Sequence, residues 1–207
     1  INYSMLISIL LILPCAVGYI VLAQPIYKMI YPNASLGADL LQLSAVALIF
    51  SALNQTMSGS LQGIGKIYTP ATGLLIGCIA KIILNIILIR QPSINIYGAA
   101  VSSIVCQVIT FAVSFTVLTR NIPVKLTLRK YIAAPLASAA IMGVSAYGVY
   151  KLIMVLISRN TIATLASIIA AAFVYLICII AFKILSREEV EMLPMGNKLC
   201  KIFSRFL

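Results

Sequence analysis

Six long apolar runs, separated by short polar connections, constrain the fold of this chain more than any other feature. Each run has about the 20 residues that an α-helix, rising ~1.5 Å per residue, needs to cross ~30 Å of hydrocarbon. Composition agrees, because 62% of the 207 residues are hydrophobic and only 9% are charged, which is too apolar for a water-soluble domain. The sequence therefore predicts an all-α, polytopic membrane bundle with six transmembrane helices, at residues 4–23, 40–61, 70–89, 96–118, 131–152 and 161–184.

The positive charges lie mainly in the connections and predict an orientation in the membrane. The net charge is +11, from 15 Lys and Arg residues against four acids. Ten of the basic residues fall on the side that holds the C-terminal tail, four fall on the other side, and Lys81 lies within a run. Because cytoplasmic loops carry the excess of Lys and Arg, the C-terminus is predicted to be cytoplasmic. Such a surface favours anionic lipids of the cytoplasmic leaflet over nucleic acid as a partner.

The chain is expected to divide into a six-span bundle, residues 1–186, and a cytoplasmic tail, residues 187–207. In the tail, Leu199, Ile202 and Phe203 recur at helical spacing opposite Lys198 and Lys201. This pattern predicts an amphipathic helix on the membrane surface, and a frayed tail is the alternative. The first run starts without a cationic segment or a cleavage site before it, so it is interpreted as a span, and an N-terminal part is expected to be missing.

Proline shapes the expectations for the first span and the connection after it. Pro14 lies in the middle of the first run, where it removes a backbone hydrogen bond and predicts a kink. Residues 24–39 form the longest connection, with Pro25, Pro32 and Gly37, and are expected to form a partly ordered loop.

Three consecutive runs carry a polar stripe on one helix face, whereas the last two carry only scattered polar residues. Polar groups in lipid are costly unless they meet one another or water, so spans two, three and four are predicted to face a common interior. Spans five and six are predicted to face lipid on most sides. For the Ser, Thr and Gly members, tight helix packing is the favoured alternative. The stripes are Ser44, Ser51, Gln55, Ser58 and Gln62; Gly73, Gly77, Lys81 and Asn85; and Ser103, Gln107, Thr110 and Ser114.

Lys81 is the residue with the clearest functional signal. It lies about midway along its run, where a cation costs a few kcal/mol on insertion scales. No acid of this chain is placed to pair with it, which leaves a wet cavity, an acid in a missing part or deprotonation as explanations. An anionic substrate such as a phosphate or pyrophosphate would be a natural partner. The predicted substrate-binding residues are Lys81, Asn85, Gln55, Gln62 and Gln107.

Residues typical of catalytic or metal chemistry are scarce. The chain has no His, and none of its four acids falls in the middle of a run. Its five cysteines lack the spacing of metal or redox sites and are interpreted as small core residues. The sequence therefore predicts no catalytic residues, no metal, no cofactor and no enzymatic activity.

Several segments, in their order and spacing, resemble the C-terminal lobe of the multidrug/oligosaccharidyl-lipid/polysaccharide (MOP) flippase superfamily. They are LQGIGK at residues 61–66 with Pro70 beyond, the span with Lys81 and Asn85, and IYGAA at residues 96–100. The segment SREEVEMLPMG at residues 186–196 resembles the stage V sporulation protein B branch, whose polysaccharide-biosynthesis-type members are related to the lipid II flippases.

The resemblance covers nearly the whole chain. It implies one lobe of a MATE-like transporter, roughly the second half of a protein of about 14 spans that works by alternating access and partners a missing N-terminal lobe. It implies a flippase or exporter of a lipid-linked oligosaccharide or peptidoglycan precursor, of the undecaprenyl-pyrophosphate type, in the bacterial cytoplasmic membrane. The process would be cell-envelope or spore-cortex assembly. Lys81 would attract the pyrophosphate, and the four amide side chains would bind sugar or headgroup oxygens.

Two other functions stay open on the sequence alone. The first is a cation-coupled multidrug exporter of the same fold, which predicts an acidic coupling site outside this chain. The second is a membrane scaffold that recruits envelope-synthesis enzymes through its basic loop and tail, which predicts that Lys81 is dispensable.

Overall fold

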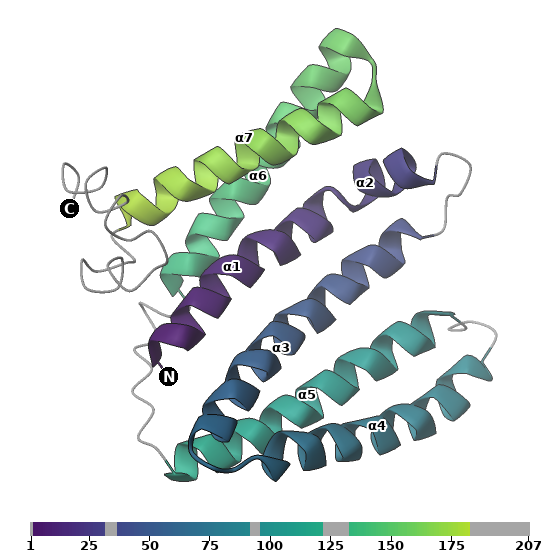
Figure 1. Cartoon of the computed structure of the whole chain (residues 1–207). Helices are drawn as coiled ribbons and strands as arrows, with labels where there is room; N and C mark the ends of the chain where they lie inside the picture. The colour runs from purple at the N-terminus through teal and green to yellow at the C-terminus, as the bar shows by residue number, and fades with distance from the viewer. Residues whose placement is uncertain (1, 32–36, 92–95, 122–132, 183–207) are drawn as a thin grey trace. The chain divides into compact units, whose positions relative to one another are not determined.

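The structure, a computed structural model, describes residues 2–31, 37–91, 96–121 and 133–182. These residues form helices and short connections between them (Figure 1). Six of the helices, all except α2, are long and apolar enough to cross a membrane by length and composition. This confirms the predicted all-α fold with six membrane-crossing helices. The helices are α1 (Asn2–Val21), α2 (Ala23–Ile30), α3 (Ala38–Gly63), α4 (Tyr68–Ile89), α5 (Ile96–Asn121), α6 (Ala134–Ile157) and α7 (Asn160–Ala181).

The helix bounds follow the apolar runs closely, and the largest difference at a helix end is that of α6. Its run was predicted to end at residue 152, but the helix continues to Ile157. Lys151 does not stop the helix, because lysine is a good helix former; its Nζ lies 4.9 Å from the ring centroid of Tyr147, one turn earlier. Ser158, in the left-handed region with φ 54°, ends the helix. The predicted tail, residues 187–207, lies outside the described residues.

The connection after the first span is more helical than predicted. α1 runs through Pro14 and ends at Val21, and α2 begins two residues later. Pro25 fits there because it lies in the first turn of α2, where backbone N–H groups have no partner within the helix. The ring of Tyr27 occupies the space that a Cβ on Gly37 would need, so a larger residue at that position would require the ring to move.

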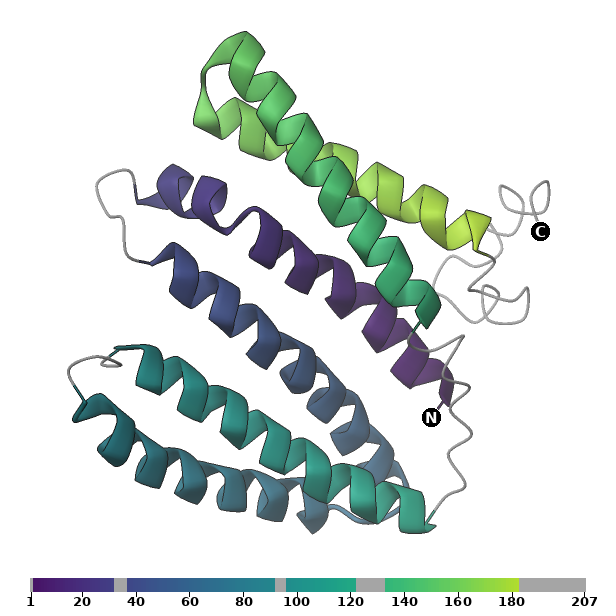
Figure 2. The same ribbon diagram turned by 180° about the vertical axis from the view of Figure 1, so that it is seen from behind.

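The first of two compact units holds α1 to α5. In it, α1, α3, α5 and α4 lie side by side in that order, as both ribbon views show (Figures 1 and 2). α3 is therefore central, with α1 on one side and α5 on the other. This order places α1 and α3 next to each other.

An apolar cluster holds together the ends of three helices in this unit. Met5 of α1, Met57 and Leu61 of α3 and Leu118 of α5 are almost completely buried against one another. Phe111 packs at its edge, with its ring centroid 5.6 Å from that of Phe115. Lipid is as apolar as these side chains, so close packing rather than water exclusion stabilises the contact. The cluster fixes the first turns of α1 beside the last turns of α3.

Glycine lets α4 and α5 approach closely along the stripe predicted from the sequence. A Cβ on Gly77 would lie 2.7 Å from the backbone oxygen of Cys106, and one on Gly73 would lie 3.3 Å from Val113 Cβ. The Thr110 hydroxyl, buried in this contact, lies 3.4 Å from the carbonyl oxygen of Gly73. These glycines pack one helix against another, as the alternative interpretation of the stripes expected.

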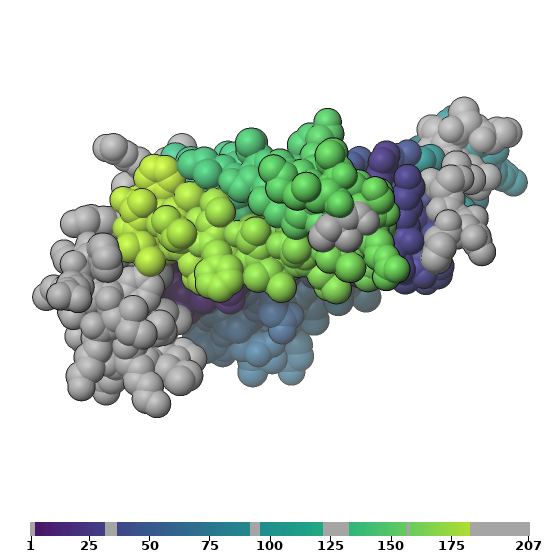
Figure 3. Space-filling model, turned by 90° about the horizontal axis from the view of Figure 1, so that it is seen from above, coloured from purple at the N-terminus to yellow at the C-terminus, as the bar shows by residue number. Residues whose placement is uncertain are grey.

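The second unit is a hairpin of α6 and α7. Its contact contains small side chains, and Thr164 and Ser167 are fully buried in it. Both hydroxyls donate to carbonyls of their own helix, at 2.7 and 2.8 Å. Large apolar side chains such as Val155 and Phe173 are exposed on this hairpin, and Figure 3 shows one of its faces. This is the distribution that lipid-facing helices need.

Candidate functional site

Two of the predicted site residues lie on α4. Lys81 and Asn85 are both half-buried and lie one turn apart, on the same face of α4 as Gly73 and Gly77. Asn85 Oδ1 accepts a hydrogen bond from the hydroxyl of Ser102 on α5. No ion pair to Lys81 occurs among the described residues, where Asp39 is the only acid.

Gln107 is engaged in the contact between α3 and α5. Asn54, which is 7% exposed, donates from Nδ2 to the backbone oxygen of Gln107 at 3.0 Å and to its Oε1 at 2.9 Å. The amide oxygen of Asn54, Oδ1, is buried without a partner in the part of the chain that the structure describes. Both oxygens of Gln107 therefore serve helix packing in this structure.

The remaining two predicted residues, Gln55 and Gln62, are exposed on α3. No hydrogen bond joins any two of the five predicted residues, all of which lie in the described ranges. The structure thus divides them between helix contacts and open surface, and Gln55 lines the pocket described next. Their role in substrate binding stays a prediction.

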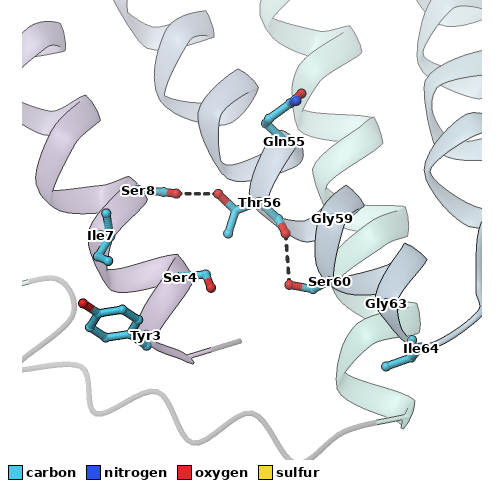
Figure 4. A pocket seen from close by; sticks show the side chains of 10 residues that line it. All are labelled: Tyr3, Ser4, Ile7, Ser8, Gln55, Thr56, Gly59, Ser60, Gly63 and Ile64. Atoms are coloured by element: carbon cyan, nitrogen blue, oxygen red, sulfur yellow. Dashed lines mark hydrogen bonds between the residues drawn. The ribbon is translucent and has the colours of Figure 1, made fainter. Parts of the chain in front are cut away.

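The cavity is a pocket between the first turns of α1 and the last turns of α3 (Figure 4). Its volume is about 690 Å³, within the ~300–1,000 Å³ usual for small-molecule sites. All of its side chains are uncharged. They are Tyr3, Ser4, Ile7 and Ser8 of α1, with Gln55, Thr56, Gly59, Ser60, Gly63 and, just beyond the helix, Ile64.

Small residues on α3 keep this pocket open. A Cβ on Gly59 or Gly63 would meet nothing within 4 Å, so these positions face free space. Farther in, the Ser8 and Thr56 hydroxyls meet and join the two helices. The Ser8–Thr56 hydrogen bond therefore lies at one end of the pocket, and the apolar cluster of Met5, Met57 and Leu61 lies beside it.

Three hydroxyls of the pocket, those of Ser8, Thr56 and Ser60, donate their protons to the protein itself. Thr56 Oγ1 donates to the carbonyl oxygen of Ala52 at 3.1 Å, and Ser60 Oγ donates to that of Thr56 at 3.0 Å. Because Thr56 has one proton and uses it there, Ser8 is the donor in its bond with Thr56. Oxygen lone pairs on all three side chains are left for a ligand.

Sequence reasoning missed most of this pocket. It singled out Gln55 but gave no substrate-binding role to Ser4, Ser8, Thr56 or Ser60, and it interpreted the segment at residues 59–63 as a packing surface. One usable signal was present, because Ser4 and Ser8 are four residues apart in an apolar run and so share a helix face. The arrangement can bind a polar, uncharged group. Among the described residues no group of three or more His, Cys, Asp or Glu can hold a metal ion.

Comparison with known proteins gives two related chains. The chain is 31% identical over 191 residues to the lipid II flippase MurJ of Bacillus subtilis (strain 168), which covers 86% of this chain and 34% of that protein. It is 24% identical over 200 residues to the uncharacterized membrane protein YabM of the same strain, which covers 91% of this chain and 36% of that protein. The chain thus spans about a third of the length of these curated relatives.

No protein-family model matches the chain, and no solved structure matches it significantly. The two similarities support a flippase-like family of membrane proteins. They do not single out the stage V sporulation protein B branch.

Proposed function

We propose that this chain is part of a flippase that moves a lipid-linked glycan or peptidoglycan precursor across the bacterial cytoplasmic membrane. The observation that carries this proposal is the similarity over 86% of the chain to a protein named lipid II flippase. Six helices able to cross a membrane agree with it. A flippase is a transporter, so the proposal includes no catalytic step. Cell-envelope or spore-cortex assembly is the process that we propose for it.

In this proposal Lys81 attracts the pyrophosphate of the substrate. The side chain is half-buried in the middle of α4, next to the polar Asn85 one turn on. A cation at this depth costs a few kcal/mol unless a partner offsets it. A pyrophosphate that reaches Lys81 would supply that partner without an acid from this chain.

Complementation of a strain depleted of its lipid II flippase tests both parts of the proposal. The whole protein that carries this chain is expected to restore growth. Lys81→Met should abolish the rescue with unchanged membrane levels, whereas Lys81→Arg should retain part of it because the charge stays. Lys151→Met is the matched control, since that ammonium lies over Tyr147 on α6.

The outcomes separate the function from the role of the lysine. Full rescue by Lys81→Met would rule out the pyrophosphate contact but leave the function standing. A wild-type protein that reaches the membrane and neither rescues growth nor moves a labelled lipid-linked precursor in vesicles would refute the function itself.

A further inference from the structure

We propose that the pocket between α1 and α3 binds an uncharged, hydroxyl-bearing group of the sugar type. The inference deepens the proposed function and rests on it only in identifying that group with the glycan of a lipid-linked precursor. It assigns the glycan to a place separate from Lys81, which lies on α4 outside this pocket.

The hydrogen-bonding capacity of the pocket selects ligands that donate. The protons of Ser8, Thr56 and Ser60 are already donated to protein oxygens. Each hydroxyl oxygen has lone pairs left, so the pocket offers acceptors to an incoming group. Sugar hydroxyls and acetamido N–H groups are donors that match these acceptors. A phosphate at neutral pH offers chiefly acceptor oxygens, which cannot form hydrogen bonds with the acceptor oxygens of the pocket.

The absence of charge excludes ions from the same place. Among the described residues, none of the ten that line the pocket is an Asp, Glu, Lys, Arg or His. An anion or a cation entering would lose hydration without gaining a counter-charge, which is strongly unfavourable. The pocket therefore favours a neutral polyol over both a pyrophosphate and a cationic drug.

The shape of the pocket suits a ring with one polar edge and two apolar faces. Gly59 and Gly63 present flat backbone without side chains, and Tyr3 and Ile7 offer apolar surface across from them. Gln55 can supply both an amide donor and an acceptor at the rim (Figure 4). A volume of about 690 Å³ leaves room for more than one sugar ring.

Protection of an introduced thiol tests the proposal directly. In the whole protein, with the native cysteines replaced, Ser4→Cys puts a thiol at the exposed rim of the pocket. Its labelling by a water-soluble maleimide is then measured in membrane vesicles with added N,N′-diacetylchitobiose, inorganic pyrophosphate or tetraethylammonium. We expect the disaccharide at millimolar concentration to slow labelling several-fold and the two ions to leave the rate unchanged.

Variants connect the protection to the pocket oxygens. Thr56→Val keeps the side-chain shape but removes the acceptor oxygen. The same degree of thiol protection should then need about fivefold more disaccharide, as expected for the loss of one hydrogen bond of ~1 kcal/mol. Thr116→Val is the matched control, because that exposed hydroxyl on α5 bonds only its own helix, to Ala112. Gly59→Leu fills the pocket from a position with free space around it and should abolish protection without loss of folded protein.

Three results would overturn the assignment: protection by pyrophosphate or tetraethylammonium at equal concentration, no protection by the disaccharide, or equal protection in Gly59→Leu. The assay is independent of transport. Precursor flipping without sugar protection would refute this inference alone, whereas sugar protection in a protein that does not flip precursors would refute the proposed function alone.

Discussion

Two helix contacts in the first unit use glycine in opposite ways. Between α4 and α5, Gly73 and Gly77 let the backbones meet, and a methyl group on Gly77 would strike the backbone of the other helix. Between α1 and α3, Gly59 and Gly63 have nothing near them, and the helices leave a pocket. The same residue type closes one contact and opens the other. The difference lies in the neighbouring helix and not in the residue.

The polar residues follow the same division. Ser102 and Asn54 donate across helix contacts, where each stabilises a neighbour. Ser60 and Thr56 donate within their own helix, and Thr56 also accepts from Ser8 of α1, so their oxygens keep lone pairs that face the pocket. We infer that the α4–α5 contact is structural and that the α1–α3 groove is available for a ligand.

The largest expected effect comes from adding a side chain to each contact. Gly77→Ala should destabilise the protein by about 1–3 kcal/mol because the neighbour that it meets is backbone and cannot rotate away. Gly59→Ala should leave stability unchanged. Thermal unfolding of the purified protein in detergent, followed by size exclusion, measures both. Equal Tm values for the two variants would remove the distinction between the contacts.

A smaller effect is expected at the amide that joins α3 to α5. Asn54→Leu should cost about 0.6–1.7 kcal/mol for each of the two bonds to Gln107, the range found for hydrogen bonds between membrane helices. Asn121→Leu serves as its control, because that amide bonds the Val117 carbonyl of its own helix. The same unfolding assay applies. If Asn121→Leu lowered Tm as much as Asn54→Leu, the hydrogen bond between α3 and α5 would stabilise the protein no more than a bond within one helix.

The smallest effect distinguishes two serines. Ser102→Ala removes a fully buried hydroxyl that bonds Asn85, and we expect a loss of about 0.6 kcal/mol. Ser60→Ala removes a hydroxyl that bonds its own helix and should not change Tm, although it should weaken protection by the disaccharide. If Ser60→Ala lowered Tm more than Ser102→Ala, the pocket hydroxyls would have to be counted as structural.

The sequence predicted those parts of the fold that depend on a single helix. Span number and span bounds follow from the length of apolar runs, and the stripe of Gly73 and Gly77 correctly indicated a closely packed face. The α2 helix was missed because two prolines and a glycine nearby outweighed a segment of only eight residues.

Which helices become neighbours cannot be read from one helix at a time, and the pocket depends on that. Asn54 and Gln55 show the difficulty, because one residue turns the helix by about 100°. Gln55 was assigned with Gln107 to a shared interior, yet Asn54 bonds Gln107 and Gln55 lines the pocket beside α1. Without the order α1, α3, α5 and α4, the face of α3 toward α1 could not be assigned.

The Asn54–Gln107 bond also bears on the order in which the chain enters the membrane. Most Ser and Thr side chains donate to carbonyls of their own helix, as Ser145 does to Ile141, so their helices can leave the translocon singly. Asn54 instead donates across the helix contact, to a partner that lies 53 residues downstream on α5. This hydrogen bond cannot form until α4 and α5 have been synthesised. Insertion of the first unit is expected to be concerted from α3 onward, whereas the α6–α7 hairpin can follow as a separate step.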